Sequence, residues 1–355
     1  MPTVSKPVVT LKTVAKHAGL SLATVSYALR QHPKIPADTR ALVAKAAVEL
    51  GYRPNPRVAS LMAHIRGAHA RAHQERLAFV WVHTTRGEAR KDPFLRNVFA
   101  GARERANQTG FCLEEFWTND PGMNDRRLEQ ILRTRGIVGV VLSPVTTAEA
   151  SVTVDWDWSH FSAAVIGNVT WTPELHHAGH HHFLGMRMAL RELEQLGCTR
   201  PAALIERKTN ERAKRAWEAA FLTHHAQPKV AQTLVRVTET EDDFGLAAWL
   251  LKSKADALVV SEAQLLLQPR LAAASRRLKI PLVTLHWSES TPPEFGGIDQ
   301  CYDRVAAHAV DLVAAQLNAN ETGVPDLASI MLFPGRWVAP KVAGRSTKAR
   351  HVRAN

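Results

Sequence analysis

The sequence predicts a small all-helical domain at the N-terminus, followed by a larger α/β body. Charge separates the two, because residues 1–66 carry a net charge of +8 and the remaining residues only +4. Such an excess at one end favours a nucleic-acid-binding module, although a solvated basic face remains the alternative. Residue pattern separates them as well: helical spacing fills the first 50 residues, and from residue 76 short apolar runs alternate with amphipathic segments.

Composition excludes several other classes of protein. Hydrophobic residues make up 45% of the chain and charged residues 22%, which is typical of globular proteins. The three cysteines are far apart and lack a CxxC pair, so we expect a reducing compartment and no disulfide framework. No signal peptide or apolar stretch of membrane-spanning length is evident, which predicts a soluble, cytoplasmic protein.

Three short helices are predicted within residues 11–50. The first, residues 11–18, ends at Gly19, because glycine accepts the left-handed conformation that commonly follows a helix. Ser21 is a good N-cap for the second, residues 22–30, and the third covers residues 37–50. A helix, a tight glycine turn and a helix form a helix-turn-helix, so residues 9–53 are predicted to be a DNA-binding headpiece. The positions expected to face its core are Val14, Ala15, Ala18, Leu20, Val25, Ala28, Leu29, Leu42, Val43, Ala46 and Leu50.

This region strongly resembles the headpiece of the LacI/GalR (lac repressor and galactose repressor) family of bacterial transcription factors. The segments VTLKTVAKHAGLSLATVSYAL and ADTRALVAKAAVELGYRPN carry the resemblance. It implies a cytoplasmic, nucleoid-associated regulator, most simply a repressor, that binds an inverted-repeat DNA operator as a homodimer. The operator, the regulated genes and the sign of regulation are not readable from the residues.

The resemblance places the second helix in the major groove with its N-terminal end leading. Base-reading positions then fall on Leu22, Ala23 and Tyr27, and the family commonly has arginine at the last of these. Arginine reads guanine through two hydrogen bonds and tyrosine cannot, so we expect a different operator sequence. The alternative role for Tyr27 is packing within the headpiece. The residues expected to contact DNA phosphates are Thr10, Leu11, Ser21, Thr24, Ser26, Lys34, Thr39, Asn55 and Arg57.

A hinge helix is expected at residues 54–64, after the helix-breaking sequence Pro-Asn-Pro. A helix of this length is marginal alone in water, and in the family it orders only on the operator. When this sequence is aligned with the family without gaps, Leu61 falls on the leucine that family members insert into the minor groove. Val58 and Met62 lie beside it. The alternative is that Leu61 only packs within the helix. Residues 65–76 are interpreted as a linker and residues 346–355 as a basic tail.

Residues 77–345 are expected to form two Rossmann-like α/β lobes that bind an effector and hold the dimer together. This part resembles, more weakly, the periplasmic-binding-protein-like domain of the same family, which implies crossings between lobes near residues 167–172, 286–293 and 325–331. Strands are predicted at residues 77–82, 137–142, 163–166, 202–205, 257–260 and 282–285. Helices are predicted at residues 94–109, 125–134, 184–196, 211–224, 244–251, 268–278 and 302–317.

Ligands of such folds bind where the carboxyl ends of the strands of both lobes face each other. The family's effector-binding arginine aligns with Ala213, and His181-His182 and Ser261-Glu262 replace Asp-Asn and Asn-Asp. We therefore expect a small-molecule effector, with a sugar as one class, but not a sugar held in the usual way. Trp217 is assigned to the core. The residues predicted to line the cleft are Asp92, Phe94, Ser143, Asn168, Asn210, Arg212, Glu262, Trp287 and Gln300.

The segment HHAGHHH, residues 176–182, places histidines at helical i, i+4 spacing, which can hold a metal. No cysteine or HExxH carboxylate completes a site, so we interpret the segment as a solvated loop before a helix. We also find no GxSxG, P-loop or GxGxxG motif, and expect no enzymatic activity, cofactor or metal. The open alternatives are a solute-binding protein or sugar enzyme on the same scaffold, and a regulator with a ligand-free cleft.

Overall fold

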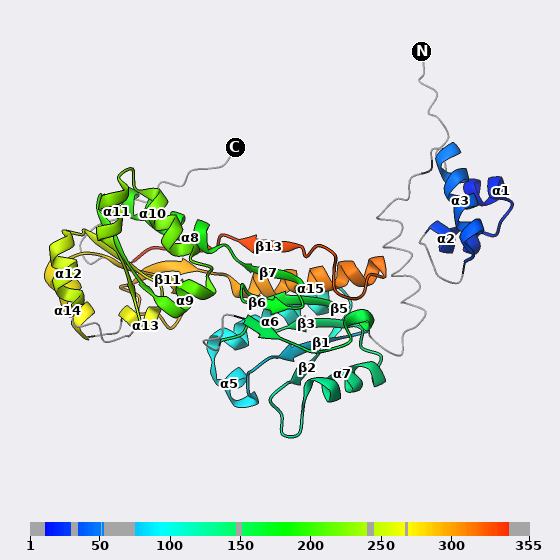
Figure 1. Cartoon of the computed structure of the whole chain (residues 1–355), viewed down its shortest axis with the longest axis horizontal. Helices are drawn as coiled ribbons and strands as arrows, with labels where there is room; N and C mark the ends of the chain where they lie inside the picture. The colour runs from blue at the N-terminus through cyan, green and yellow to red at the C-terminus, as the bar shows by residue number, and fades with distance from the viewer. Residues whose placement is uncertain are drawn as a thin grey trace, which may run out of the picture. The chain divides into compact units, whose positions relative to one another are not determined.

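The structure is a computed structural model that describes residues 11–29, 35–50, 52, 75–146, 151–239, 245–266 and 269–340. The chain divides into two compact units, Met1–His73 and Gln74–Asn355 (Figure 1). Each unit is described by itself below. No helix among the described residues combines the length and the apolar character needed to cross a membrane.

The first unit contains the three predicted helices, α1 (Leu11–Ala18), α2 (Leu22–Leu29) and α3 (Ala37–Glu49). Gly19 has a φ of +66°, and the Leu20 amide donates to the Ala15 carbonyl at 3.1 Å, so a Schellman turn ends α1. The Ser21 hydroxyl then accepts from the Thr24 amide at 3.0 Å, which confirms it as the N-cap of α2.

The core of this unit is small and lies between the three helices. Val14, Val25 and Val43 are fully buried in it, and Leu20 packs against it from the turn. The prediction for Leu42 is wrong, because its side chain is 49% exposed and Ala47 takes the inward position instead. The buried side chains of α3 are those of Val43, Ala46 and Ala47, so this helix face turns Leu42 toward solvent.

The first lobe of the second unit is built on a six-stranded sheet in the order β13-β7-β5-β3-β1-β2, and all its neighbouring strands are parallel. Side chains of β1 alternate between its faces: Leu77 and Phe79 pack under α6 and α15, and Ala78 and Val80 face α7. The strands are β1 (Arg76–Trp81), β2 (Cys112–Trp117), β3 (Gly139–Leu142), β5 (Ser162–Ile166), β7 (His176–His180) and β13 (Ile330–Phe333).

Helices and short strands cover both faces of this sheet (Figure 1). Its helices are α5 (Arg86–Lys91), α6 (Pro93–Gln108), α7 (Asp125–Thr134) and α15 (Tyr302–Ala319), with a 3-10 turn at Trp158–His160. A small two-stranded sheet of β4 (Ser151–Thr153) and β6 (Thr170–Thr172) lies beside it. Trp171 belongs to the apolar cluster on this side, so it is a core residue of the lobe.

The second lobe has a sheet in the order β14-β12-β11-β10-β8-β9, parallel except for the antiparallel pair β12 and β14. Its strands are β8 (Pro201–Glu206), β9 (Val235–Thr238), β10 (Ala257–Val260), β11 (Leu282–Trp287), β12 (Gly296–Asp299) and β14 (Arg336–Val338). Its helices are α8 (His182–Gln195), α9 (Arg207–Arg212), α10 (Ala216–His224), α11 (Pro228–Leu234), α12 (Leu246–Ser253), α13 (Ala263–Leu266) and α14 (Pro269–Leu278). The two Rossmann-like lobes predicted from the sequence are thus present.

The chain crosses between the lobes at three places, and the sequence predicted each of them too early. The crossings lie between β7 and α8, between β12 and α15, and between β13 and β14. Each expected crossing precedes a strand that the sequence prediction lacked, namely β7, β12 and β13. Because those strands still belong to the sheet before the crossing, the true crossings come later in the chain.

Two local predictions in the body are also wrong. The histidine-rich segment is not a solvated loop: residues 176–180 form β7 between β5 and β13, and His180 is buried. The helix expected at residues 211–224 is two helices, because Lys214 and Arg215 adopt positive φ angles between α9 and α10.

Candidate DNA-binding surface and ligand cleft

The helix α2 presents two large side chains to solvent. Leu22 is 49% and Tyr27 is 44% exposed, whereas Val25 and Ala28 on the same helix are buried. The exposure of Tyr27 favours the predicted contact with bases over packing within the headpiece. The side chain of Ala23, the third predicted base-reading residue, lies outside what the structure describes.

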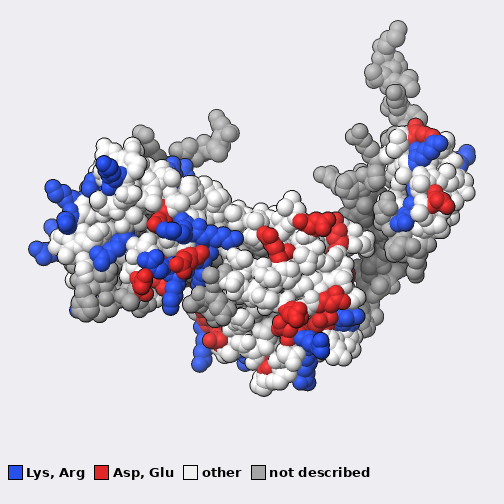
Figure 2. All heavy atoms as spheres, in the orientation of Figure 1, with Lys and Arg blue, Asp and Glu red and all other residues white. Residues whose placement is uncertain are grey.

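The predicted phosphate contacts remain predictions, and the described ones lie on the helices of the headpiece or, for the exposed Ser21, at the N-cap of α2. Leu11 is the first residue of α1, and Thr24, Ser26 and Thr39 are partly exposed on α2 and α3. The basic residues of the described headpiece are Lys12, Lys16, Arg40 and Lys45, and both signs of charge are visible there in Figure 2. The predictions for Thr10, Lys34, Asn55, Arg57, Val58, Leu61 and Met62 fall outside the described residues.

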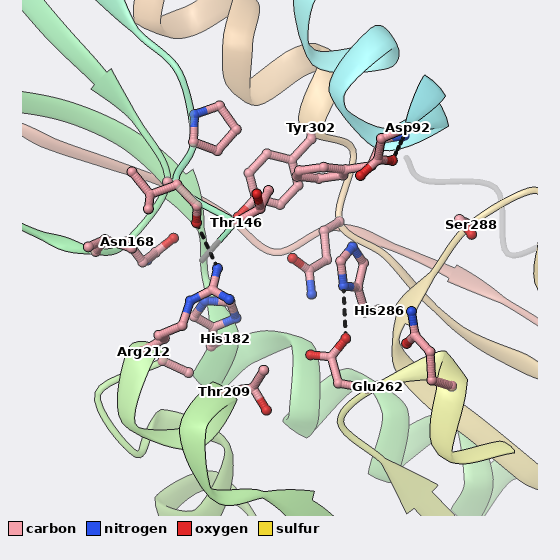
Figure 3. A pocket seen from close by; sticks show the side chains of 18 of the residues that line it. Asp92, Thr146, Asn168, His182, Thr209, Arg212, Glu262, His286, Ser288 and Tyr302 are labelled. Carbon is pink, nitrogen blue, oxygen red and sulfur yellow. Dashed lines mark hydrogen bonds and ion pairs between the residues drawn. The ribbon is translucent and has the colours of Figure 1, made fainter. Parts of the chain in front are cut away.

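A cavity of about 380 Å³ lies between the two lobes of the second unit (Figure 3). Its walls are the segments that follow β1, β3 and β5 in the first lobe and β8, β10 and β11 in the second. This is the edge where carboxyl ends of parallel strands meet. Six of the nine predicted cleft residues line it: Asp92, Phe94, Asn168, Arg212, Glu262 and Gln300.

The other three predicted residues do not line the cavity. Ser143 is fully buried and accepts a hydrogen bond from the Val82 amide at 3.0 Å, which fixes the chain after β1. Asn210 is buried on α9 and donates to Glu218 at 2.9 Å. Trp287 follows His286 on a strand, where successive side chains point to opposite faces, so only His286 reaches the cavity.

Several lining residues were missed by the sequence analysis. They are polar or aromatic and follow strands or flank a crossing, which is the signal that could have found them: Thr146, His182, Thr209, Gln264, His286, Ser288, Ser290 and Tyr302. Trp217, assigned to the core, is 3% exposed and also borders the cavity. Its ring meets that of His182 edge-on, with centroids 4.7 Å apart.

Arg212 links the two lobes across the cavity. Its Nη2 donates to the Val145 carbonyl of the first lobe at 3.0 Å (Figure 3). Its Nε is buried and has no hydrogen-bond partner among the described residues. Phe94 of the first lobe adds a second bridge, an edge-on contact with His286 at 5.5 Å between ring centroids. The arrangement thus places a cation in the wall of the cleft, and its Nε is an unused donor.

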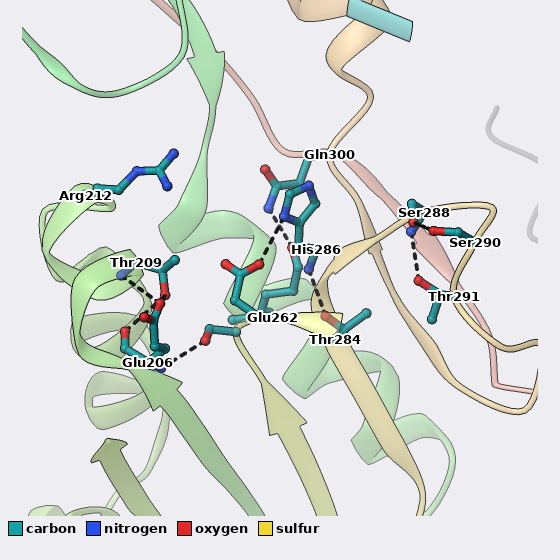
Figure 4. A network of polar contacts seen from close by, with 12 residues as sticks. Glu206, Thr209, Arg212, Glu262, Thr284, His286, Ser288, Ser290, Thr291 and Gln300 are labelled. Atoms are coloured by element: carbon teal, nitrogen blue, oxygen red, sulfur yellow. Dashed lines mark hydrogen bonds and ion pairs between the residues drawn. The ribbon is translucent and has the colours of Figure 1, made fainter. Parts of the chain in front are cut away.

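A network of polar contacts fixes the second-lobe wall of the cavity (Figure 4). Glu262 lies 3.4 Å from Nδ1 of His286, whose amide donates to the Thr284 hydroxyl at 3.1 Å. Gln300 donates to the Leu285 carbonyl at 2.7 Å, which leaves its amide oxygen for another partner. Glu206 caps α9 by accepting from the Thr209 amide at 3.2 Å, so the helix that carries Arg212 starts at a defined place.

Two side chains of the cleft have strongly shifted pKa values. Burial, together with the positive charges of His286 and Arg212, lowers the pKa of His182 to about 3. Burial raises the pKa of Tyr302 to about 12. Both groups are therefore neutral near pH 7 and act as hydrogen-bonding groups. Among the described residues no group of three or more His, Cys, Asp or Glu side chains is arranged to hold a metal ion.

Comparison with known proteins gives a match over the headpiece. Residues 10–55 match the family described as bacterial regulatory proteins, lacI family. A curated relative, the HTH-type transcriptional regulator AglR of Rhizobium meliloti (strain 1021), is 53% identical over 47 residues. That alignment covers 13% of this chain and 13% of the relative, so the chain matches only a small part of that protein.

Solved structures resemble three quarters or more of the chain in fold. The lac repressor bound to ONPG in its repressed state is 20% identical, over 95% of this chain and 100% of that one, with a TM-score of 0.52. The lac repressor dimer bound to operator and the anti-inducer ONPF is 18% identical, over 95% and 99%, with a TM-score of 0.51. A lacI-family protein from Rhizobium etli is 13% identical, over 76% and 99%, with a TM-score of 0.54. At these identities the likeness establishes the fold: a helical headpiece and a periplasmic-binding-protein-like body.

Proposed function

Residues 10–55 carry a DNA-binding domain of the lacI family, and from this premise we propose that the chain is a sequence-specific transcriptional regulator. In this proposal a small molecule in the cleft changes the affinity of the protein for its DNA operator. The relatives are themselves regulators and a curated one is named as such, which supports a non-enzymatic role in the cytoplasm. Repression is the expected sign of regulation.

The strongest support for DNA binding comes from the exposed face of α2. Leu22 and Tyr27 are large side chains turned to solvent on the helix that follows the glycine turn. Exposed apolar groups on a recognition helix can contact thymine methyl groups, and the tyrosine hydroxyl can hydrogen-bond to a base edge. The Schellman turn and the Ser21 cap hold this helix against α1, so its face is preformed.

The support for ligand control comes from the cleft. Its walls are contributed by both lobes, so a ligand there contacts both and favours one relative position of the lobes over others. Of the similar lac repressor structures, one is a dimer bound to operator and ONPF, and another is bound to ONPG. By analogy we propose that this chain acts as a homodimer on an inverted repeat, since one headpiece offers too little surface for tight specific binding.

The proposal is tested by selecting binding sites from a random duplex library with the full chain. We expect an inverted repeat whose two half-sites are read by two headpieces. Val25→Asp should abolish selection, because it places a carboxylate in the fully buried core of the headpiece. Val48→Asp is the matched control, since Val48 is 82% exposed on α3. Absence of any enriched sequence with the wild-type chain would contradict DNA-binding regulation.

The same selection tests the role of Tyr27. Tyr27→Ala should retain binding but change the preferred base at the positions it contacts, because groove contacts discriminate sequence while phosphate contacts do not. The preference at an altered position should change by up to about 1–3 kcal/mol, the usual cost of a mismatched base pair in a site. If Tyr27→Ala selects the same consensus as the wild type, the assignment of Tyr27 to base reading is wrong.

A further inference from the structure

We infer that the ligand of the cleft carries an anionic group, a carboxylate or a phosphate, which binds at Arg212, and hydroxyl groups, which bind near Glu262 and Asp92. The ligand would then be a sugar acid or a phosphorylated sugar rather than a neutral sugar. This inference rests on the proposed function, because it names the chemical class of the regulatory ligand.

The first observation is that the Arg212 guanidinium has no counter-ion among the described residues. It lines the cavity and donates a hydrogen bond to a neutral backbone carbonyl, that of Val145. Within the described part of the chain it lies in no ion pair, whereas Arg207 and Arg215 beside it pair with Glu239 and Glu218. A partly buried guanidinium without a counter-ion is unfavourable, and an anion that accepts hydrogen bonds from its fork offsets that cost.

The second observation is that other unused donors lie on the same side. The Nε of Arg212, the indole nitrogen of Trp217 and Nδ1 of His182 are each buried without a hydrogen-bond partner in the described structure. Trp217 and His182 touch each other edge-on, and all three residues line the cavity. Arg212 Nε and Trp217 Nε1 are donors, and Nδ1 of the neutral His182 donates or accepts according to its tautomer. Buried polar atoms that the protein leaves unpaired are normally matched by a ligand or water, so donors on residues that line the cavity suit the acceptor oxygens of an anion.

The third observation is the distribution of acceptors. In Figure 3 Asp92 and Glu262 lie apart from Arg212, across the cavity, so the carboxylates do not neutralise it. Asp92 caps α6 by accepting from the Phe94 amide at 2.8 Å, and Glu262 lies beside His286. Their remaining lone pairs, with the Gln300 oxygen, suit hydroxyl donors. A polyhydroxylated ligand with one acidic end matches this division, and a volume of about 380 Å³ admits a monosaccharide.

The inference is tested by titrating the full chain with matched pairs at constant ionic strength: D-galacturonate and D-galactose, D-gluconate and D-glucitol, D-glucose 6-phosphate and D-glucose. Calorimetry should show that at least one acid binds tenfold or more tightly than its neutral partner. The carboxylate and phosphate arms distinguish the two kinds of anion. An equal or higher affinity for the neutral partners, or binding of no acid at all, would overturn the inference.

A pair of variants distinguishes binding of the acid at Arg212 from a general effect of positive charge on the protein. Arg212→Gln should remove at least tenfold of the acid's affinity and leave the melting temperature of the ligand-free chain nearly unchanged. Arg207→Gln, on the same helix but outside the cavity, should bind the acid like the wild type. Unchanged affinity in Arg212→Gln would also overturn the inference. Because site selection from random DNA needs no ligand, a failed titration with a successful selection rejects the anionic ligand while DNA binding stands.

Discussion

The surroundings of His182 lower the pKa of its imidazole and keep the side chain neutral. The side chain stands at the start of α8, against Trp217 and close to His286 and Arg212, so burial and neighbouring cations both oppose its protonation. Its neighbour His180 has its pKa lowered in the same direction by burial. A neutral imidazole here can serve a ligand as donor or acceptor without adding a charge beside Arg212.

The shifted pKa of His182 predicts an acid-sensitive body. Between pH 6.5 and about 3 the unfolded chain binds a proton that the folded chain excludes, so the free energy of unfolding decreases as pH falls through this window. Above pH 6.5 the group has no effect. The slope should approach about 1.4 kcal/mol per pH unit for each such histidine. His182→Gln should reduce the slope measured by urea denaturation between pH 7 and 5.

A control for this measurement is Leu327→Gln, at a position that is 87% exposed and carries no titratable group. It should leave the pH dependence of the unfolding free energy close to that of the wild type. If His182→Gln and the wild type have the same slope, the folded and unfolded chains bind the His182 proton equally and the lowered pKa of His182 is wrong.

At the level of residues, the sequence identified the chain segments that border the cleft, because these segments follow predicted strands. It did not identify which side chains of each segment point into the cleft. Arg212 and Glu262 could be predicted because they come shortly after apolar runs. Asn210 and Trp287 come from the same places, yet one is turned into hydrogen bonds with its own lobe and the other lies on the opposite face of its strand. Such directions depend on helix breaks and strand register that composition does not reveal.

Among the elements, α6 and α15 form the closest pairing in the first lobe. A Cβ at Gly101 of α6 would lie 2.6 Å from the backbone Cα of Asp303, near the start of α15. Backbone cannot move aside as a flexible side chain can, so only glycine allows the two helices to approach this closely. The pairing matters for the cleft because α15 begins at Tyr302, and α6 at Pro93.

Gly101→Ala should therefore destabilise the body by about 1–3 kcal/mol, as for other overpacked cores. Helix propensity alone predicts the opposite sign, since alanine is favoured over glycine by about 1 kcal/mol in a helix interior. Gly87→Ala in α5 is the matched control, because a Cβ there has only the Thr85 hydroxyl within 4 Å, at 3.9 Å. Equal unfolding free energies of the two variants would contradict the close approach.

The elements that could be predicted are those with strong local signals. Apolar runs such as residues 77–82 and helices with clear ends, such as residues 125–134, agree with β1 and α7 to within a residue. The strands β7, β12 and β13 could not be predicted, because they are four or five residues long and contain histidine or glycine or lie exposed at a sheet edge. Only pairing with neighbours makes them strands, and their absence displaced the predicted crossings.

On the scale of the whole molecule, the proposed regulator needs a connection between cleft and DNA. The ligand can change operator affinity only by its differential affinity for two arrangements of the lobes. In the proposal these arrangements alter the separation of the two hinge segments in a dimer. Residues 54–64, the predicted hinge helix, lie outside the described residues, and their role rests on the resemblance of the headpiece and on the Pro54–Pro56 sequence that ends it.

Leu61 is the residue through which that geometry is predicted to reach the DNA, by insertion into the minor groove at the centre of the operator. Leu61→Ala should weaken operator binding by about 1–3 kcal/mol, the size of a lost buried apolar contact, because the smaller side chain cannot hold the base step open. Folding of the body and ligand binding in the cleft should not change, since both depend on residues 74–355. Operator titration at fixed salt, with a gel assay of DNA bending, measures the effect. Affinity and bend equal to those of the wild type would show that Leu61 is not the wedge and that the switch acts elsewhere.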